Sequence, residues 1–210
     1  MLFIDDVALM LLNAGGAFLL LAVFLLTRMG GAEPRRWAAP FAASTLVALC
    51  TGLQMVFVFP LPGPYNQIFG ECTVMLGTVL AALALSVGMG WSLLPVGLYG
   101  LVAALLPLAL GLRIVTLKLT LAPLQSGTGF VLSGVGALFA ALTFILSPKS
   151  PQDRCSGFHA CRVTGGVALL LAAALWILVG ILGAWGHAEH FGKWKPSVVV
   201  MTPPPEETQK

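Results

Sequence analysis

The chain has 210 residues, of which 58% are hydrophobic and only 9% are charged, and its formal net charge is +3. A soluble domain carries about 25% charged residues. So few charges cannot cover a water-facing surface, so most of the surface must face lipid. The basic residues lie at the ends of apolar stretches, which indicates membrane topology and argues against a nucleic-acid partner.

Six apolar stretches are long enough to cross about 30 Å of hydrocarbon, which requires about 20 helical residues. In chain order they cover residues 7–27, 38–59, 72–90, 93–112, 126–146 and 163–185. Pro107 lies inside the fourth stretch and cannot donate a hydrogen bond to the Ala103 carbonyl, so we expect a kink there. The sequence predicts an all-α fold: a polytopic membrane protein whose residues 1–196 form a six-transmembrane-helix bundle. A Pro-rich polar tail, residues 197–210, follows.

The distribution of basic residues favours one orientation of this bundle. The connections between the first and second stretches and between the fifth and sixth together hold Arg28, Arg35, Arg36, Lys149, Arg154 and Arg162. The other side holds Arg113, Lys118, Lys193, Lys195 and Lys210. By the positive-inside rule the first group is cytoplasmic. We therefore expect a multi-pass protein of the cell (inner) membrane, with the N-terminus and the C-terminus both outside.

The chain resembles itself at an offset of 59 residues. Gly52 aligns with Gly111 and Val56 with Val115, among nine identities in the 34 positions 52–85. Each copy holds two stretches, so the two copies have the same orientation in the membrane. This predicts a parallel two-helix repeat. The sixth and first stretches then form a third, circularly related pair.

Small residues follow one face of the fifth stretch at every fourth position. They are Gly129, Ser133, Ala137 and Ala141. Such a stripe allows another helix to approach closely in lipid. The neighbouring helix belongs either to this chain or to another subunit, so the expected partners are the lipid bilayer and other membrane subunits.

The polar residues at the outer ends of the stretches form the candidate ligand-binding cluster. Its members are Gln54, Tyr65, Asn66, Glu71, Arg113 and His187. Two interpretations stay open. In the first, these side chains form interfacial ion pairs, Glu71 with Arg113 above all, and satisfy loop backbone. In the second, they line a small outward-facing binding site.

A second group, at the end of the sixth stretch, suggests a metal site. His187, Glu189 and His190 offer imidazole and carboxylate ligands, which suit first-row metal ions. The two histidines face one way only if the sixth helix continues that far. An interfacial role for these residues is the alternative.

Catalytic signatures are missing from the sequence, which favours a protein that is not an enzyme. No stretch contains a histidine, which argues against haem held between helices. A quinone needs only an apolar slot and one or two hydrogen-bond donors, and these can come from Gln54, Tyr65, Arg113 or His187. No resident cofactor is expected; a metal ion and a quinone are the alternatives.

Three segments carry a family resemblance. They are Gly52–Glu71 with its Pro-Leu-Pro-Gly-Pro-Tyr-Asn run, Trp91–Gly97, and Trp185–Pro196. Together they resemble a family of small prokaryotic integral membrane proteins catalogued as domain of unknown function 981, over about residues 1–196. The resemblance implies the fold but no activity. The family often has His where this chain has Gln54, which weakens a shared metal or haem role there.

Three functions are compatible with these features. The first is a non-catalytic accessory or structural subunit of a larger membrane complex, respiratory or redox. The second is a small-solute binding or transport protein with an outward-facing polar site. The third is a quinone- or metal-associated membrane redox component.

Overall fold

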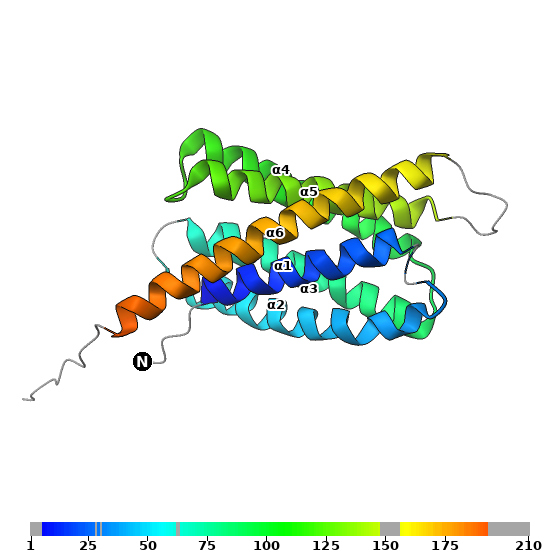
Figure 1. Ribbon diagram of the computed structural model, residues 1–210, viewed down its shortest axis with the longest axis horizontal. Helices are drawn as coiled ribbons and strands as arrows, with labels where there is room; N and C mark the ends of the chain where they lie inside the picture. The colour runs from blue at the N-terminus through cyan, green and yellow to red at the C-terminus, as the bar shows by residue number, and fades with distance from the viewer. Residues whose placement is uncertain (1–5, 28, 30, 62–63, 148–155, 193–210) are drawn as a thin grey trace, which may run out of the picture.

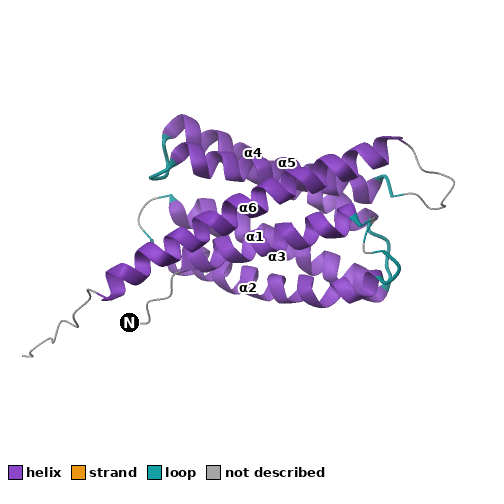
Figure 2. Cartoon of the chain, viewed as in Figure 1, coloured by secondary structure: helices purple, strands orange, loops and turns teal. Residues whose placement is uncertain are grey.

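The computed structural model describes residues 6–27, 29, 31–61, 64–147 and 156–192, the side chains at 6 and 190–192 excepted. Its long helices are α1 (Asp6–Leu26), α2 (Ala38–Val58), α3 (Tyr65–Met89), α4 (Leu94–Leu117), α5 (Pro123–Ile145) and α6 (Ser156–Gly192), with a short 3-10 helix, η1 (Pro34–Trp37), before α2 (Figures 1 and 2). Within these residues, six helices are long and apolar enough to cross a membrane. The all-α fold is confirmed, and the chain is a multi-pass membrane protein.

Two helices extend well beyond the apolar stretches that predict them. α3 begins at Tyr65 rather than at residue 72, directly after Pro64. α6 covers Ser156–Gly192, whereas the apolar stretch covers only 163–185. The difference has a simple cause, because hydrophobicity marks only the part of a helix that lies in lipid. Backbone hydrogen bonding continues until the chain leaves the helical conformation, as it does with positive φ at Phe59 after α2 and at Gly90 after α3.

The helices pack as three antiparallel pairs: α2 with α3, α4 with α5, and α1 with α6. The first two pairs are hairpins with short connections, whereas the third joins the first helix to the last (Figure 1). We call the end of the bundle where α1 begins and α6 ends the N-terminal end. There α2 and α4 also end and α3 and α5 begin, whereas α1, α3 and α5 end and α2, α4 and α6 begin at the opposite end.

Paired glycines bring the two helices of each hairpin close together. A β-carbon added to Gly52 would lie 3.2 Å from the Gly70 carbonyl oxygen, and one added to Gly127 would lie 2.8 Å from the Gly111 oxygen. Gly52 and Gly111 obey the offset of 59, but Gly70 and Gly127 are 57 residues apart. The second hairpin is therefore two residues shorter between its paired glycines, so the glycine pairs of the two hairpins do not follow one common offset. That the two hairpins superpose stays a prediction.

The α1–α6 pair has a similarly close approach without a connecting loop. A β-carbon on Gly15 would lie 3.1 Å from the Ala173 carbonyl oxygen. At the opposite end of the bundle, Arg162 of α6 is buried and donates hydrogen bonds to the carbonyl oxygens of Leu25 and Leu26, at 3.1 and 2.8 Å. These carbonyls end α1 and have no donor within their own helix. Arg162 thus joins the two helices, in addition to adding a positive charge at that end.

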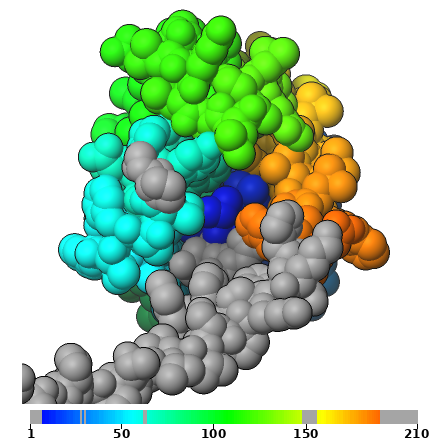
Figure 3. Space-filling view, turned by 90° about the vertical axis from the view of Figure 1, so that its left-hand side faces the viewer, coloured from blue at the N-terminus to red at the C-terminus, as the bar shows by residue number. Residues whose placement is uncertain are grey.

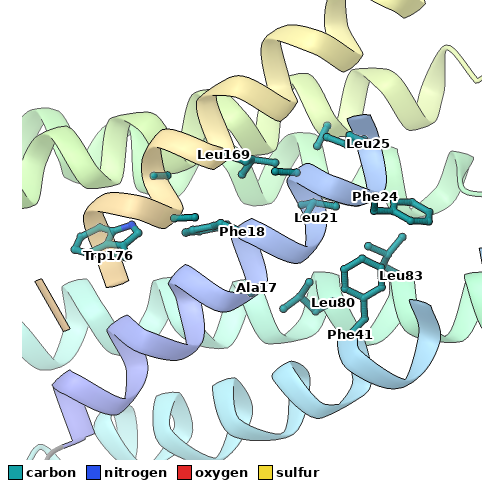
Figure 4. Packing of buried hydrophobic residues seen from close by; sticks show 14 of the residues in the cluster. Ala17, Phe18, Leu21, Phe24, Leu25, Phe41, Leu80, Leu83, Leu169 and Trp176 are labelled. Carbon is teal, nitrogen blue, oxygen red and sulfur yellow. The ribbon is translucent and has the colours of Figure 1, made fainter. Parts of the chain in front are cut away.

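The core follows α1, α3 and α5, and the lipid-facing surface lies mainly on the other three helices. Half of the apolar window of α1 and of α5 is buried, against 22% for α4. Figure 4 shows Phe24, Phe41, Leu80 and Leu83 gathered between α1, α2 and α3. Phe24 meets Phe41 edge-on, with ring centroids 5.6 Å apart. Such packing fixes the positions of α1 and α3, which line the cavity described next.

Candidate functional site

Two members of the predicted polar cluster hold the connections at the N-terminal end. Asn66 is fully buried, and its Oδ1 accepts a hydrogen bond from the Leu61 N–H at 3.1 Å while its Nδ2 donates to the Leu61 carbonyl. The Tyr65 hydroxyl accepts a hydrogen bond from the Leu121 N–H at 3.1 Å, which ties α3 to the connection between α4 and α5. Both polar groups therefore satisfy loop backbone, as the first interpretation of the cluster expects.

The other four members of the cluster are not gathered into one described network. Glu71 and Arg113 are both exposed, and no ion pair joins them within the part of the chain that the structure describes. Gln54 is half-buried near the end of α2, and His187 is exposed near the end of α6. The structure thus places all six residues toward the N-terminal end of the bundle, and that they form one binding site stays a prediction.

The predicted metal ligands lie on the last turns of α6. The helix continues through Gly192, so the condition for His187 and His190 to face one way is met. His187 and Glu189 are exposed, while the side chain of His190 lies outside the described residues. Among the described residues, no three His, Cys, Asp or Glu side chains gather as a metal site would require.

A cavity inside the bundle is the most developed candidate site. It measures about 110 Å³, is partly open to the surface, and is lined by α1, α3, α4 and α5 with Trp176 of α6. An engineered apolar cavity of about 150 Å³ stays dry and takes up benzene. None of the six predicted cluster residues lines this cavity.

Aromatic rings line part of the cavity wall. Phe130 lies between Phe69 and Trp176, with ring centroids 5.4 Å from each. The Trp176 indole N–H donates to Ser133 Oγ at 2.9 Å, and the Ser133 hydroxyl donates to the Gly129 carbonyl at 2.7 Å. The indole donor and the serine hydroxyl proton are thus already bonded, and this wall presents carbon to the cavity.

The α3–α4 side of the cavity is the less tightly packed side. α3 and α4 are consecutive, yet they contact each other much less extensively than either contacts its hairpin partner. The exposed Tyr99 hydroxyl of α4 lies 3.6 Å from the Met75 sulfur of α3, and Met75 lines the cavity. Figure 3 views the N-terminal end and shows a hollow between the α2–α3, α4–α5 and α6 surfaces, with the blue α1 at its base.

Sequence reasoning misses this cavity because its lining comes from five helices. One signal was available: Gly100, Ala103, Ala104 and Pro107 place small residues and a proline on one face of α4. The small-residue stripe of α5 is internal, since Gly129 packs against Trp176 and Ser133 lines the cavity. The predicted tail, residues 197–210, lies outside the described residues.

Comparison with known proteins adds the family and little beyond it. The family described as "Protein of unknown function (DUF981)" matches residues 1–190. None of the curated proteins and none of the solved structures matches the chain. The match spans all six helices to within two residues of the end of α6. The chain therefore belongs to the DUF981 family, as its Pro-Leu-Pro-Gly-Pro-Tyr-Asn segment indicates.

Proposed function

We propose that this chain is a non-catalytic membrane protein that binds a small hydrophobic molecule drawn from the bilayer. The observation that carries the proposal is the apolar cavity inside helices that cross the membrane. Ligand sites are typically concave and lined mainly by apolar and aromatic side chains with few polar groups. The cavity has this composition, and it lies where a lipid-soluble molecule is abundant.

A polar or charged solute fits the cavity poorly. No Asp, Glu, Lys, Arg or His belongs to the described residues that line it. A charged group moved from water into such a place loses hydration worth about 3 kcal/mol or more, and nothing there replaces it. A neutral apolar ligand loses no hydration, because it moves from the hydrocarbon of the bilayer into an apolar cavity.

The structure changes the support for each of the three functions that are compatible with the sequence. A solute site at the outer mouth has less support, since Tyr65 and Asn66 are engaged with loop backbone. The accessory-subunit hypothesis loses one argument, because the α5 stripe is used inside the chain. A quinone remains one possible hydrophobic ligand, although none of the donors suggested for it lines the cavity.

We also propose the orientation with both termini outside. Arg35 and Arg36 are exposed in η1 at the opposite end, and Arg162 lies at that end as well. Arg113 and Lys118 lie toward the N-terminal end. The positive-inside rule then places the opposite end in the cytoplasm, and the hollow of Figure 3 faces outward.

Photolabelling of the protein in nanodiscs tests the binding function. An octane derivative that carries a diazirine should label peptides of α3 and α5 that line the cavity, around Thr73 and Phe130. Ala103→Phe, which fills the cavity from α4, should abolish this labelling. Ala109→Phe, on the exposed face of the same helix, should preserve it. Labelling confined to lipid-facing residues, unchanged by Ala103→Phe, would refute the proposal.

A further inference from the structure

We infer that the ligand of the cavity is a lipophilic alcohol, a hydrocarbon that carries one neutral hydroxyl group. This inference rests on the proposed binding function and adds the chemistry of the head group. Two polar groups carry it: the Thr73 hydroxyl on α3 and the Ala103 carbonyl on α4. Both residues line the cavity, and the contact from Met75 to Tyr99 shows that α3 and α4 lie side by side there. Neither group has the partner that it would have in most helices, since Thr73 donates to no carbonyl among the described residues and Pro107 has no N–H to give to Ala103.

Thr73 differs from three other threonines of the bundle in the bonding of its hydroxyl. Thr51, Thr78 and Thr143 each donate to the carbonyl four residues earlier, at 2.7–2.9 Å. Thr73 is 8% exposed and forms no such bond among the residues that the structure describes. Among the described residues, the side-chain atoms that are fully enclosed and have no partner are Trp37 Nε1 and Thr45 Oγ1. Thr73 Oγ1 is not one of them, so protein atoms do not enclose it completely. The Thr73 hydroxyl is therefore available to a molecule in the cavity.

The Ala103 carbonyl is left without its helical donor by Pro107. α4 runs without interruption from Leu94 to Leu117, with Pro107 inside it. The carbonyl of residue i normally accepts from the N–H of residue i+4, and proline has no N–H. Ala103 and Pro107 both line the cavity, and Ala103 is 9% exposed. A buried acceptor without a donor is costly, and a ligand donor relieves that cost.

The two groups together select a hydroxyl. A carbonyl, an ether or an oxidised quinone can accept from Thr73 but has no proton to give to Ala103. A hydroxyl donates to the Ala103 carbonyl and can also accept from the Thr73 hydroxyl. Ionised head groups are disfavoured because the described lining holds no ion of opposite charge. The alkyl or ring portion then packs against Phe69, Phe130 and Leu76 of the same cavity.

Competition against the diazirine-octane label measures this selectivity. 1-Octanol, its methyl ether and octane are added in turn to the protein in nanodiscs, at equal concentrations within the bilayer. Octanol should compete about fivefold better than the ether, since one hydrogen bond between neutral groups contributes about 1 kcal/mol and every 1.4 kcal/mol is tenfold. Pro107→Ala, which supplies an N–H to Ala103, should remove most of the preference for octanol over the ether. Thr73→Val should keep that preference and should instead remove most of the advantage that octanol and the ether both have over octane, because both accept from the Thr73 hydroxyl. Thr78→Val is the matched control on α3, and it should keep both preferences.

The outcomes distinguish a failure of the alcohol inference from a failure of the proposed binding function. If octanol, ether and octane compete equally while the cavity is still labelled, the alcohol inference is wrong and the binding function stands. If no probe labels the cavity, both are wrong. The octane label itself reports whether the cavity persists in Thr73→Val and Pro107→Ala. A preference for octanol over the ether that survives Pro107→Ala overturns the assignment to the Ala103 carbonyl. An advantage of octanol and the ether over octane that survives Thr73→Val overturns the assignment to the Thr73 hydroxyl.

Discussion

The guanidinium group of Arg162 donates a hydrogen bond to the Leu26 carbonyl at 2.8 Å and so joins the last helix to the end of the first. A second bond reaches Leu25, and His159 Nδ1 lies 3.3 Å from the other terminal nitrogen of the guanidinium. A cation at the C-terminal end of a helix also interacts favourably with the helix dipole. Arg162 thus links α1 to α6, two helices that no loop connects directly.

Replacement of Arg162 by Met should destabilise the bundle by about 2–3 kcal/mol, because it leaves buried carbonyls without donors. Thermal unfolding in mild detergent measures the loss. Arg36→Met removes an exposed charge from the same end and should change stability by less than about 0.5 kcal/mol. Equal melting temperatures for the two variants would show that the Arg162 cap is not structural.

The bond from Trp176 to Ser133 predicts an asymmetric pair of variants. Ser133→Ala leaves the buried indole N–H without an acceptor and should cost about 1–3 kcal/mol. Ser133 keeps its bond to Gly129 in Trp176→Phe, so there the cost is a lost hydrogen bond and some packing. A double-mutant cycle should then give a coupling of about 1 kcal/mol between the two residues. A coupling near zero would contradict the bond.

The close approach of the paired glycines of α4 and α5 predicts that one added methyl group disturbs the packing of these helices. Gly127→Ala places a methyl group 2.4 Å from a Val115 methyl carbon and 2.8 Å from the Gly111 oxygen. The helices must separate, so stability in detergent should fall by about 1–3 kcal/mol. Gly183→Ala is the matched control, since nothing lies within 4 Å of its new methyl group. It should stabilise α6 by about 0.5–1 kcal/mol. The reverse order of the two variants would refute the close approach.

The contact from Tyr99 to Met75 predicts a kinetic effect at the α3–α4 side of the cavity. Tyr99→Phe removes the weak hydroxyl–sulfur bond between the two helices, so the diazirine-octane label should reach the cavity faster. The label is added to nanodiscs and photolysed after increasing delays. Tyr99→Phe should leave the final extent of labelling unchanged, because Tyr99 does not line the cavity. An unchanged rate would place the route of the ligand elsewhere.

The proposed orientation predicts the side from which added cysteines react. An impermeant maleimide applied to intact cells should label Lys118→Cys and should spare Arg35→Cys, with both variants made in a chain whose own cysteines are serine. Permeabilised cells should label both. External labelling of Arg35→Cys would invert the orientation and move the hollow of Figure 3 to the cytoplasmic side.

The helices are legible in the sequence because their signal is local. Runs of apolar residues about 20 long fix the existence of each helix, and only the polar ends, such as Tyr65 to Glu71 in α3, escape that rule. The family resemblance at Pro60–Asn66 is likewise a local signal. These features do not depend on where other helices lie.

The cavity is not legible in the same way, because it depends on how five helices meet. Pro107 predicts a missing hydrogen bond but not that Thr73 of α3 lines the same cavity. The sequence predicts Arg162 to be a charge in a loop, because its hydrogen-bond acceptors, the carbonyls of Leu25 and Leu26, are far away along the chain. Gly129 reads as part of a stripe, and only the packed structure shows that Trp176 fills the space beside it.

The α1–α6 pair has a consequence for the making of the protein. α1 leaves the ribosome before every other helix, and its principal partner leaves last. Until then the groove at Gly15 and the free carbonyls at the end of α1 have no α6 to cover them. The two hairpins can assemble while synthesis continues, but the bundle closes only when the final helix enters the membrane. A stalled or truncated chain therefore exposes its first helix to whatever quality-control machinery surveys the bilayer.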